Sequence, residues 1–262
     1  MIHFERRKLL QVASAMAASA LVHPLWADDT PLSDRPTTAA DPLALFLTWQ
    51  RDPTTTMTIQ WIAAADNETN AKVWYAQDGA MDWHEAAVER RAFPMTDLRM
   101  GRSELRGLEP GTHYRFRLGT AGAEQRFRTM PAKATETITF VSGGDSGISA
   151  DAQRTNAVAA AQDPMFVVIG GDLAYENGKD AKTFLKFLQN YSRQMIDSQR
   201  RLIPFVATIG NHEVNGGYGK PRSDAPFFYA VFDGLFPHAG YATLDFGQYL
   251  SLVLLDTNHT TP

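Results

Sequence analysis

The chain's 262 residues are enough for two modest domains and too many for one small module. Its composition, 44% hydrophobic and 21% charged, is that of a globular protein and excludes a disordered or fibrous one. The net charge of −4 argues against a nucleic-acid-binding surface, because phosphate backbones require clustered cations. Cysteine is absent, so any metal ion must be held by oxygen and imidazole ligands.

Residues 1–27 have the features of an export signal. A basic start at residues 6–8 precedes an Ala-rich apolar run, and residues 25–27 offer a cleavage site. The run is too short and interrupted to span a bilayer of about 30 Å, so we expect no transmembrane anchor. The paired arginines followed by two leucines resemble a twin-arginine signal, whereas Glu5 and Gln11 depart from that pattern and leave a general secretory signal as the alternative. We therefore expect a periplasmic or secreted protein that uses the twin-arginine export machinery during secretion.

The next part of the chain has the pattern of short antiparallel strands. Residues 28–40 are polar and contain proline, which indicates a linker. Between residues 41 and 131, turn residues separate short segments such as Thr56–Trp61 and His113–Leu118, in which apolar and polar residues alternate. This spacing predicts an all-β sandwich of about 90 residues.

After Pro131 the pattern changes to apolar strands that alternate with helices. The predicted strands are residues 138–142, 165–169 and 205–209, and the predicted helices are residues 149–161 and 181–202. The strands are continuous apolar runs, as expected for strands buried on both faces. Strand–helix alternation predicts a parallel sheet, and such sheets bind their ligands beyond the carboxyl ends of the strands.

Each of these strands is followed by glycine and then by a polar oxygen donor. The strings are Gly144-Asp145-Ser146-Gly147, Gly171-Asp172-Leu173-Ala174-Tyr175 and Gly210-Asn211-His212-Glu213. A single Gly-Asp after a strand is usually a turn or an N-cap, so the prediction depends on the three occurring in order. Parallel strands bring Asp145, Asp172 and Asn211 to one edge, where the carboxylates repel each other unless a cation lies between them. A carboxylate can bridge two ions about 3.5–4 Å apart, the spacing of two-metal phosphoryl chemistry.

Together the three strings resemble the metallophosphoesterase (calcineurin-like) superfamily, and Tyr175 makes the resemblance closest to purple acid phosphatases. The L-x-P-G-T-x-Y turn at residues 108–114 and the F-R-T-M-P string at residues 127–131 resemble the fibronectin type III sandwich that precedes those enzymes. The resemblance implies a fibronectin III-like purple acid phosphatase N-terminal domain at residues 41–131. It also implies the N-terminal part of a calcineurin-like α/β/β/α sandwich at residues 137–262.

The resemblance further implies the roles of five residues. Asp145 would bind a ferric ion, Asp172 would bridge both metals, and Tyr175 would be a phenolate on iron. Asn211 would bind the second, divalent ion (Fe, Zn or Mn). His212 would contact the phosphate or protonate the leaving group, which makes it the catalytic residue and, with Asn211, a substrate-binding residue.

The implied function is hydrolysis of small-molecule phosphate monoesters by a metal-activated hydroxide, as in an acid phosphatase. Two enzyme alternatives are a phosphodiesterase and a twin-arginine-exported alkaline phosphatase, although in the latter a D-D-H-E string usually replaces the G-N-H-E at Gly210–Glu213. An alternative of another class is an exported binding protein with an inert α/β domain.

The family's later ligands, a lone histidine and a G-H-x-H motif, have no match here. After His212 the sequence has only His238 and His259, and we expect His259 to be a loop histidine. We therefore expect a fragment of a longer reading frame that is inactive without the missing histidines. The Gly-rich segment 214–226, with Lys220 and Arg222, either overhangs the substrate or is a simple connection.

Overall fold

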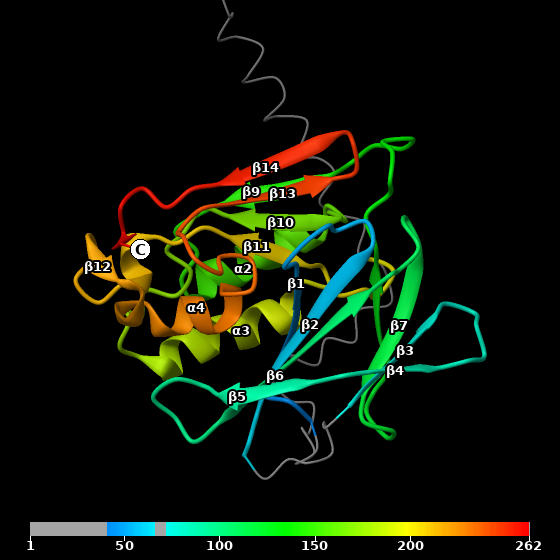
Figure 1. Ribbon diagram of the computed structural model, residues 1–262, viewed down its shortest axis with the longest axis horizontal. Helices are drawn as coiled ribbons and strands as arrows, with labels where there is room; N and C mark the ends of the chain where they lie inside the picture. Colours follow the sequence, from blue (N-terminus) through cyan, green and yellow to red (C-terminus); the bar gives the residue numbers. More distant parts are fainter. Residues whose placement is uncertain (1–40, 66–71, 262) are drawn as a thin grey trace, which may run out of the picture. The chain divides into compact units, whose positions relative to one another are not determined.

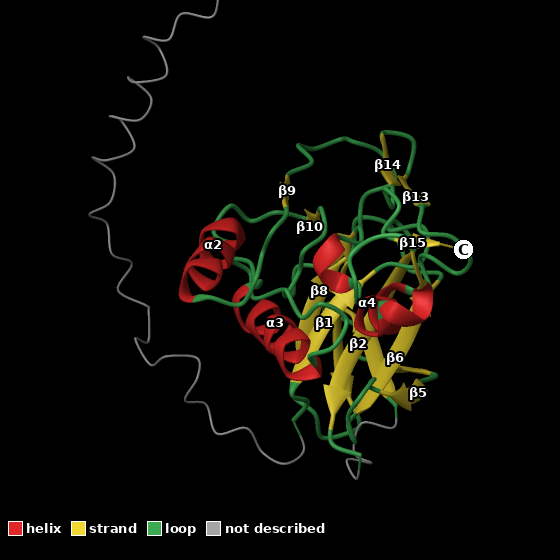
Figure 2. Cartoon of the chain, turned by 90° about the vertical axis from the view of Figure 1, so that its left-hand side faces the viewer, coloured by secondary structure: helices red, strands yellow, loops and turns green. Residues whose placement is uncertain are grey.

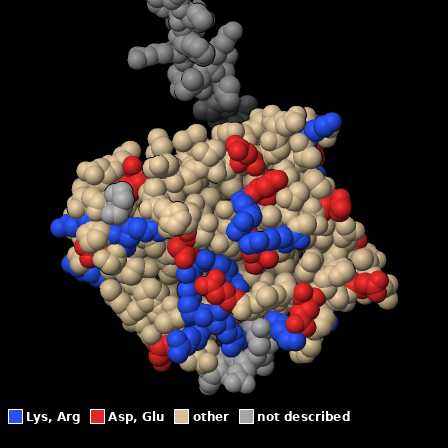
Figure 3. Space-filling model, in the orientation of Figure 1, with Lys and Arg blue, Asp and Glu red and all other residues tan. Residues whose placement is uncertain are grey.

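The computed structural model describes residues 41–65 and 72–261 (Figure 1). The expected export signal at residues 1–27 and the linker at residues 28–40 lie outside this part of the chain. Among the described residues, none of the helices combines the length and the hydrophobicity of a membrane span. On the face drawn in Figure 3, basic and acidic side chains are interspersed.

The N-terminal half consists of two antiparallel four-stranded sheets. One has the order β1-β2-β6-β5 and the other the order β4-β3-β7-β8. The strands are β1 (Ala44–Thr48), β2 (Thr56–Ala63), β3 (Val73–Gln77), β4 (His84–Ala86), β5 (Glu89–Ala92), β6 (Arg99–Arg106), β7 (His113–Leu118) and β8 (Gln125–Arg128). In β7 buried residues alternate with half-buried ones, as the sequence predicts. The prediction of a mostly β N-terminal domain is confirmed, and its likeness to a fibronectin III domain stays a prediction.

A three-stranded parallel sheet forms the centre of the C-terminal half. Its strands are β9 (Phe140–Gly143), β10 (Phe166–Ile169) and β11 (Phe205–Ala207), in the order β11-β10-β9. Helix α2 (Ala150–Ala160) connects the first two strands and α3 (Ala181–Gln194) connects the last two. The side chains of Ser149 and Asp180 accept backbone N–H bonds at the helix N-termini, which fixes where the helices begin. The predicted parallel sheet is therefore confirmed.

The expectation that all three parallel strands are buried on both faces is wrong for β9. Three of its four residues are exposed, and the side chain of Phe140 is 42% exposed. The reason is that β9 is an edge strand, with β10 as its neighbour in the described sheet. The ring of Phe140 stacks on that of Phe166 with centroids 5.0 Å apart. The apolar residues of β9 therefore pack on one side only.

The predicted helix at residues 181–202 ends eight residues early. Met195 leaves the helical conformation (φ −87°, ψ 66°). Asp197 then accepts the backbone N–H groups of Gln199 and Arg201, which closes a tight turn. Met195 is nevertheless buried. Its burial explains why the apolar spacing in the sequence continues after the helix has ended.

The remaining elements follow β11 in the chain. They are η3 (Asn211–Glu213), β12 (Lys220–Pro221), η4 (Arg222–Asp224), α4 (Pro226–Phe232), β13 (Ala242–Phe246), β14 (Leu250–Leu254) and β15 (Thr260–Thr261). Strands β13 and β14 form an antiparallel hairpin, whereas β12 and β15 pair in parallel although they lie far apart in the sequence.

The first antiparallel sheet packs against the α/β half, with α3 beside β1 (Figure 2). The rings of Phe46 on β1 and Phe205 on β11 lie 6.0 Å apart. Buried Arg102 on β6 donates to the carbonyls of Ala230 and Val231 in the last turn of α4. The apolar residues of both halves consequently belong to one buried cluster.

Candidate functional site

The segments that follow β9 and β10 stay paired beyond the strands. Backbone bonds run from Asp145 N to Gly171 O (3.2 Å), from Ser146 N to Asp172 O (2.9 Å) and from Gly147 N to Leu173 O (3.0 Å). These bonds hold the two aspartates on neighbouring turns at the carboxyl edge of the sheet. The edge is the one at which open α/β sheets bind their ligands.

The ends of β10 and β11 approach each other closely, and glycine permits this approach. Gly171 has φ +88°, and a Cβ there would lie 2.7 Å from the backbone of Gly210. A Cβ on Gly210 would lie 2.2 Å from Asp172 Oδ1. The buried carboxylate of Glu213 accepts the backbone N–H groups of Asp172 (2.8 Å), Leu173 (2.7 Å) and Gly210 (2.7 Å). Glu213 therefore ties the two strand ends together.

Asp172 lies at the centre of the site. Its Oδ1 accepts the backbone N–H of His212 at 3.0 Å, which places η3 and Asn211 beside it. The rings of Tyr175 and His212 lie 4.5 Å apart. Asp145, Asp172 and Tyr175 all have positive φ angles (51°, 54° and 65°), a strained conformation that other interactions must maintain. The structure thus brings all five predicted site residues to the carboxyl edge of the sheet.

Several acidic groups lie close together at this edge and affect one another's ionisation. Desolvation raises the pKa of Tyr175, and the negative charges of Asp145, Asp172 and Glu213 raise it further. A cation bound among these groups would act in the opposite direction and favour the phenolate. Two carboxylates, a phenol and an amide are hard oxygen donors suited to Fe(III), Mn or Zn. They fit a metal site as oxygen ligands, although the described residues contain no group of three or more His, Cys, Asp or Glu side chains able to hold a metal ion.

The orientation of His212 is fixed by Asn177, a residue that the sequence analysis missed. The amide nitrogen of Asn177 donates to the carbonyl of Tyr175 at 3.2 Å, so the amide oxygen faces His212 Nδ1 at 2.7 Å. That oxygen can only accept, and Nδ1 therefore carries a proton. The Nε2 atom of His212 remains available to a substrate. The left-handed φ of Asn177, +54°, suits asparagine, but the sequence alone gave no reason to pair it with His212.

A second missed residue, Glu176, is buried beneath the site. Its side chain is 2% exposed, and neither carboxyl oxygen has a hydrogen-bond partner. Burial raises the pKa of Glu176 to about 8, and the charges of Glu213, Asp172 and Asp180 add to the shift. The group is therefore largely protonated at neutral pH.

The Gly-rich segment 214–226 lies beside the site and is more than a simple connection. The hydroxyl of Tyr218 is 3.5 Å from Asn211 Oδ1, and its ring stacks on that of His259 at 4.8 Å. His259, expected as a loop histidine, precedes β15 and is only 8% exposed. Its Nδ1 lies 3.0 Å from Asp256 Oδ1. His238 is exposed.

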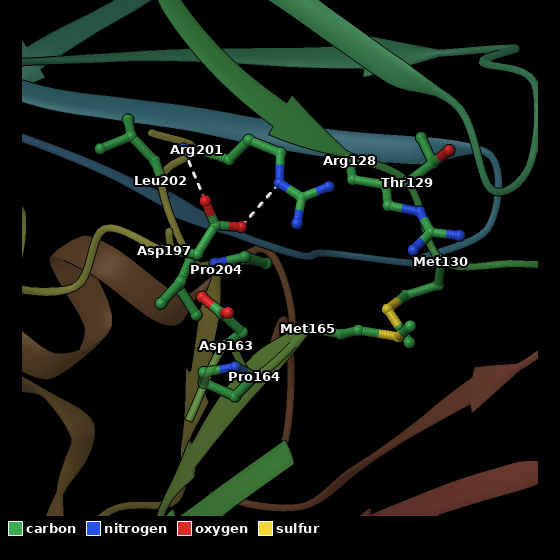
Figure 4. A pocket seen from close by; sticks show the side chains of 11 residues that line it. Arg128, Thr129, Met130, Asp163, Pro164, Met165, Asp197, Arg201, Leu202 and Pro204 are labelled. Atoms are coloured by element: carbon green, nitrogen blue, oxygen red, sulfur yellow. Dashed lines mark hydrogen bonds and ion pairs between the residues drawn. The ribbon is translucent and has the colours of Figure 1, made fainter. Parts of the chain in front are cut away.

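A separate pocket lies at the opposite end of the sheet (Figure 4). Met165 and Pro204, which line it, immediately precede β10 and β11. Arg201 in this pocket is paired with Asp197 and contacts His113 Nε2 at 2.9 Å. Partial burial lowers the pKa of His113, and the positive charge of Arg201 adds to this effect. The pocket is therefore distinct from the carboxyl-edge site.

Comparison with known families agrees with this geometry. Residues 105–259 match the model of the calcineurin-like phosphoesterases, and residues 42–141 match that of the purple acid phosphatase N-terminal domain. No curated protein matches the chain. The chain belongs to the calcineurin-like phosphoesterase family, preceded by a purple acid phosphatase N-terminal domain. Its domains are those of a phosphoric ester hydrolase, and both families are binuclear-metal enzymes.

Proposed function

We propose that this phosphoesterase is an exported binuclear-metal phosphatase that hydrolyses phosphate monoesters. The observation that carries the proposal is the convergence of Asp145, Asp172, Tyr175 and Asn211 with His212 at one sheet edge. The four oxygen donors would hold Fe(III) and a divalent ion, Fe, Zn or Mn. When bound, these ions would activate a water as nucleophile and neutralise charge on the phosphoryl group.

The chain's own residues bind the ester and donate a proton to its leaving group. Asn211 and His212 lie side by side on η3, where both can contact a phosphate oxygen. With Nδ1 held by Asn177, His212 directs Nε2 outward, and in its protonated form Nε2 donates to the departing ester oxygen. Glu213 takes no part in this step, because all its bonds go to backbone N–H groups.

Metal analysis of the full-length protein, expressed from its complete reading frame, and of its variants tests the site. Asp172→Ala removes the proposed bridging carboxylate, and we expect it to abolish binding of both metals. Asp151→Ala, at an 83% exposed side chain on α2, is the control and should retain them. Two metals per chain in Asp172→Ala would refute the assignment. Tyr175→Phe should keep most of the metal and lose any phenolate-to-iron absorption; unchanged colour would exclude a ferric-tyrosinate site.

A substrate panel tests the reaction. The proposal expects faster hydrolysis of monoesters than of diesters, with an optimum in acid. Preference for a diester would favour the phosphodiesterase alternative, and an alkaline optimum would favour the alkaline phosphatase. Hydrolysis of neither class by the metal-loaded full-length protein would leave the exported binding protein.

Export is proposed from residues 1–27, whose paired arginines are at positions 6 and 7. We expect the mature protein recovered from outside the cytoplasm to begin near residue 28, which mass spectrometry can measure. Replacement of both arginines by lysine should block export through the twin-arginine pathway. Normal export of that variant would indicate the general secretory route.

A further inference from the structure

An exposed aromatic ring lies directly beside the proposed phosphate-binding residues. Tyr218 is 57% exposed, and its hydroxyl is 3.5 Å from Asn211 Oδ1. Gly216 and Gly217, with φ of +96° and +82°, turn the chain back toward η3, so that a Cβ on Gly217 would lie 3.9 Å from Asn211 Cβ. Tyr218 therefore lies next to the residue that is proposed to bind phosphate.

The ring of Tyr218 is backed by a fixed support. It stacks on the buried ring of His259 with centroids 4.8 Å apart and an interplanar angle of 28°. Asp256 holds His259 in place, because its Oδ1 accepts the backbone N–H of His259 and contacts Nδ1, and its Oδ2 accepts from Thr260. These contacts fix the orientation of the Tyr218 ring and leave its other face exposed.

Backbone pairing joins this support to the Gly-rich segment. Gly219 N donates to Asn258 O at 2.9 Å and Lys220 N donates to His259 O at 3.2 Å, next to the parallel pairing of β12 with β15. The side chain of Lys220 packs over Gly216 and adds a cation to the same segment. Because the chain is held on both sides of Tyr218, its ring loses little conformational entropy when a ligand stacks on it.

We propose that Tyr218, supported by His259, is a stacking surface for an aromatic leaving group, so that the enzyme prefers phosphate esters of phenols to those of aliphatic alcohols. This inference rests on the proposed function. In a phenolic ester the ring is joined directly to the ester oxygen, which matches the adjacency of Tyr218 to Asn211. Stacked aromatic pairs have centroids about 4.5–7 Å apart.

Binding of two stable phosphonates to the metal-loaded full-length protein, measured by calorimetry, tests the inference without turnover. Phenylphosphonate carries the ring and methylphosphonate does not. We expect Tyr218→Ala to reduce the phenyl-over-methyl affinity ratio by about 3- to 10-fold, the range typical of one aromatic contact. Tyr218→Phe should keep the ratio. Tyr241→Ala, at another exposed tyrosine (68%), is the matched control and should keep it.

A second measurement uses the unmodified protein. In a sample with labelled tyrosine, phenylphosphonate should shift the ring resonances of Tyr218, and methylphosphonate should not. An unchanged affinity ratio in folded Tyr218→Ala, or equal shifts with both ligands, would overturn the stacking surface and leave the phosphatase proposal standing. Failure of the wild-type protein to bind either phosphonate would overturn the proposed function itself and the stacking surface with it.

Discussion

The buried carboxyl of Glu176 predicts a pH-dependent loss of stability that the substitution Glu176→Gln removes. Glutamine has nearly the shape of protonated glutamic acid and cannot ionise. In the folded metal-free protein the pKa of Glu176 is raised from 4.5 to about 8. The contribution of the neutral Glu176 carboxyl to the unfolding free energy is therefore fully present below pH 4.5 and is lost as the pH rises through about 8. A shift of this size corresponds to about 5 kcal/mol at about 1.4 kcal/mol per pH unit.

Urea unfolding in EDTA at several pH values measures this effect. The variant should exceed the wild type in unfolding free energy by about 1 kcal/mol at pH 5, about 3 kcal/mol at pH 7 and about 5 kcal/mol at pH 9. EDTA is needed because bound cations would stabilise the carboxylate. Glu109→Gln, the same substitution at an exposed glutamate, is the control and should give no such trend. A difference between Glu176→Gln and wild type that stays constant from pH 5 to pH 9 would refute the reasoning.

Three further predictions concern the site and its support. His212→Ala should retain both metals and lower turnover by about 10²–10⁴-fold, with a smaller loss for nitrophenyl esters, whose leaving group needs little protonation; an equal loss for all esters would indicate phosphate binding instead. Gly210→Ala should displace Asp172, because the new Cβ would lie 2.2 Å from its Oδ1, and metal content should fall; full metal content would show that the turn can relax. Arg102→Met should lower the unfolding free energy by about 3–5 kcal/mol, because it removes bonds to the last turn of α4 and to Asp233, and urea unfolding that shows a loss below about 1 kcal/mol would contradict this.

The carboxyl-edge geometry was predictable because it depends on local sequence signals. Continuous apolar runs followed by Gly and a polar residue specify buried parallel strands, and parallel pairing alone brings Asp145, Asp172 and Asn211 together. The exposure of β9 was not predictable, because strand order in the sheet, and not composition, decides which strand is at the edge. The early end of α3 depends on the turn that Asp197 forms with residues that follow it.

Contacts between residues far apart in the sequence were the parts of the site that the sequence could not predict. Asn177 and His212 are 35 positions apart, and their hydrogen bond depends on how two loops pack. The stacking of Tyr218 on His259 likewise requires the pairing of β12 with β15. For Glu213, the Gly-x-x-Glu spacing of a capping box was a usable signal for the bond to Gly210 N, but its bonds to the turn after β10 were not visible.

The contact between β6 and α4 restricts how this chain can be recombined with its relatives. The last carbonyls of α4 are satisfied by guanidinium groups of Arg91 and Arg102, which belong to the other half of the molecule. Helices more often end with a glycine or with polar groups of their own sequence. A hybrid that joins this C-terminal half to another family member's N-terminal domain would leave these carbonyls and Asp233 without their cations, unless the new domain carries arginines at equivalent strand positions. The two halves therefore form a matched pair in this chain, and domain exchange requires transfer of the arginines together with the helix.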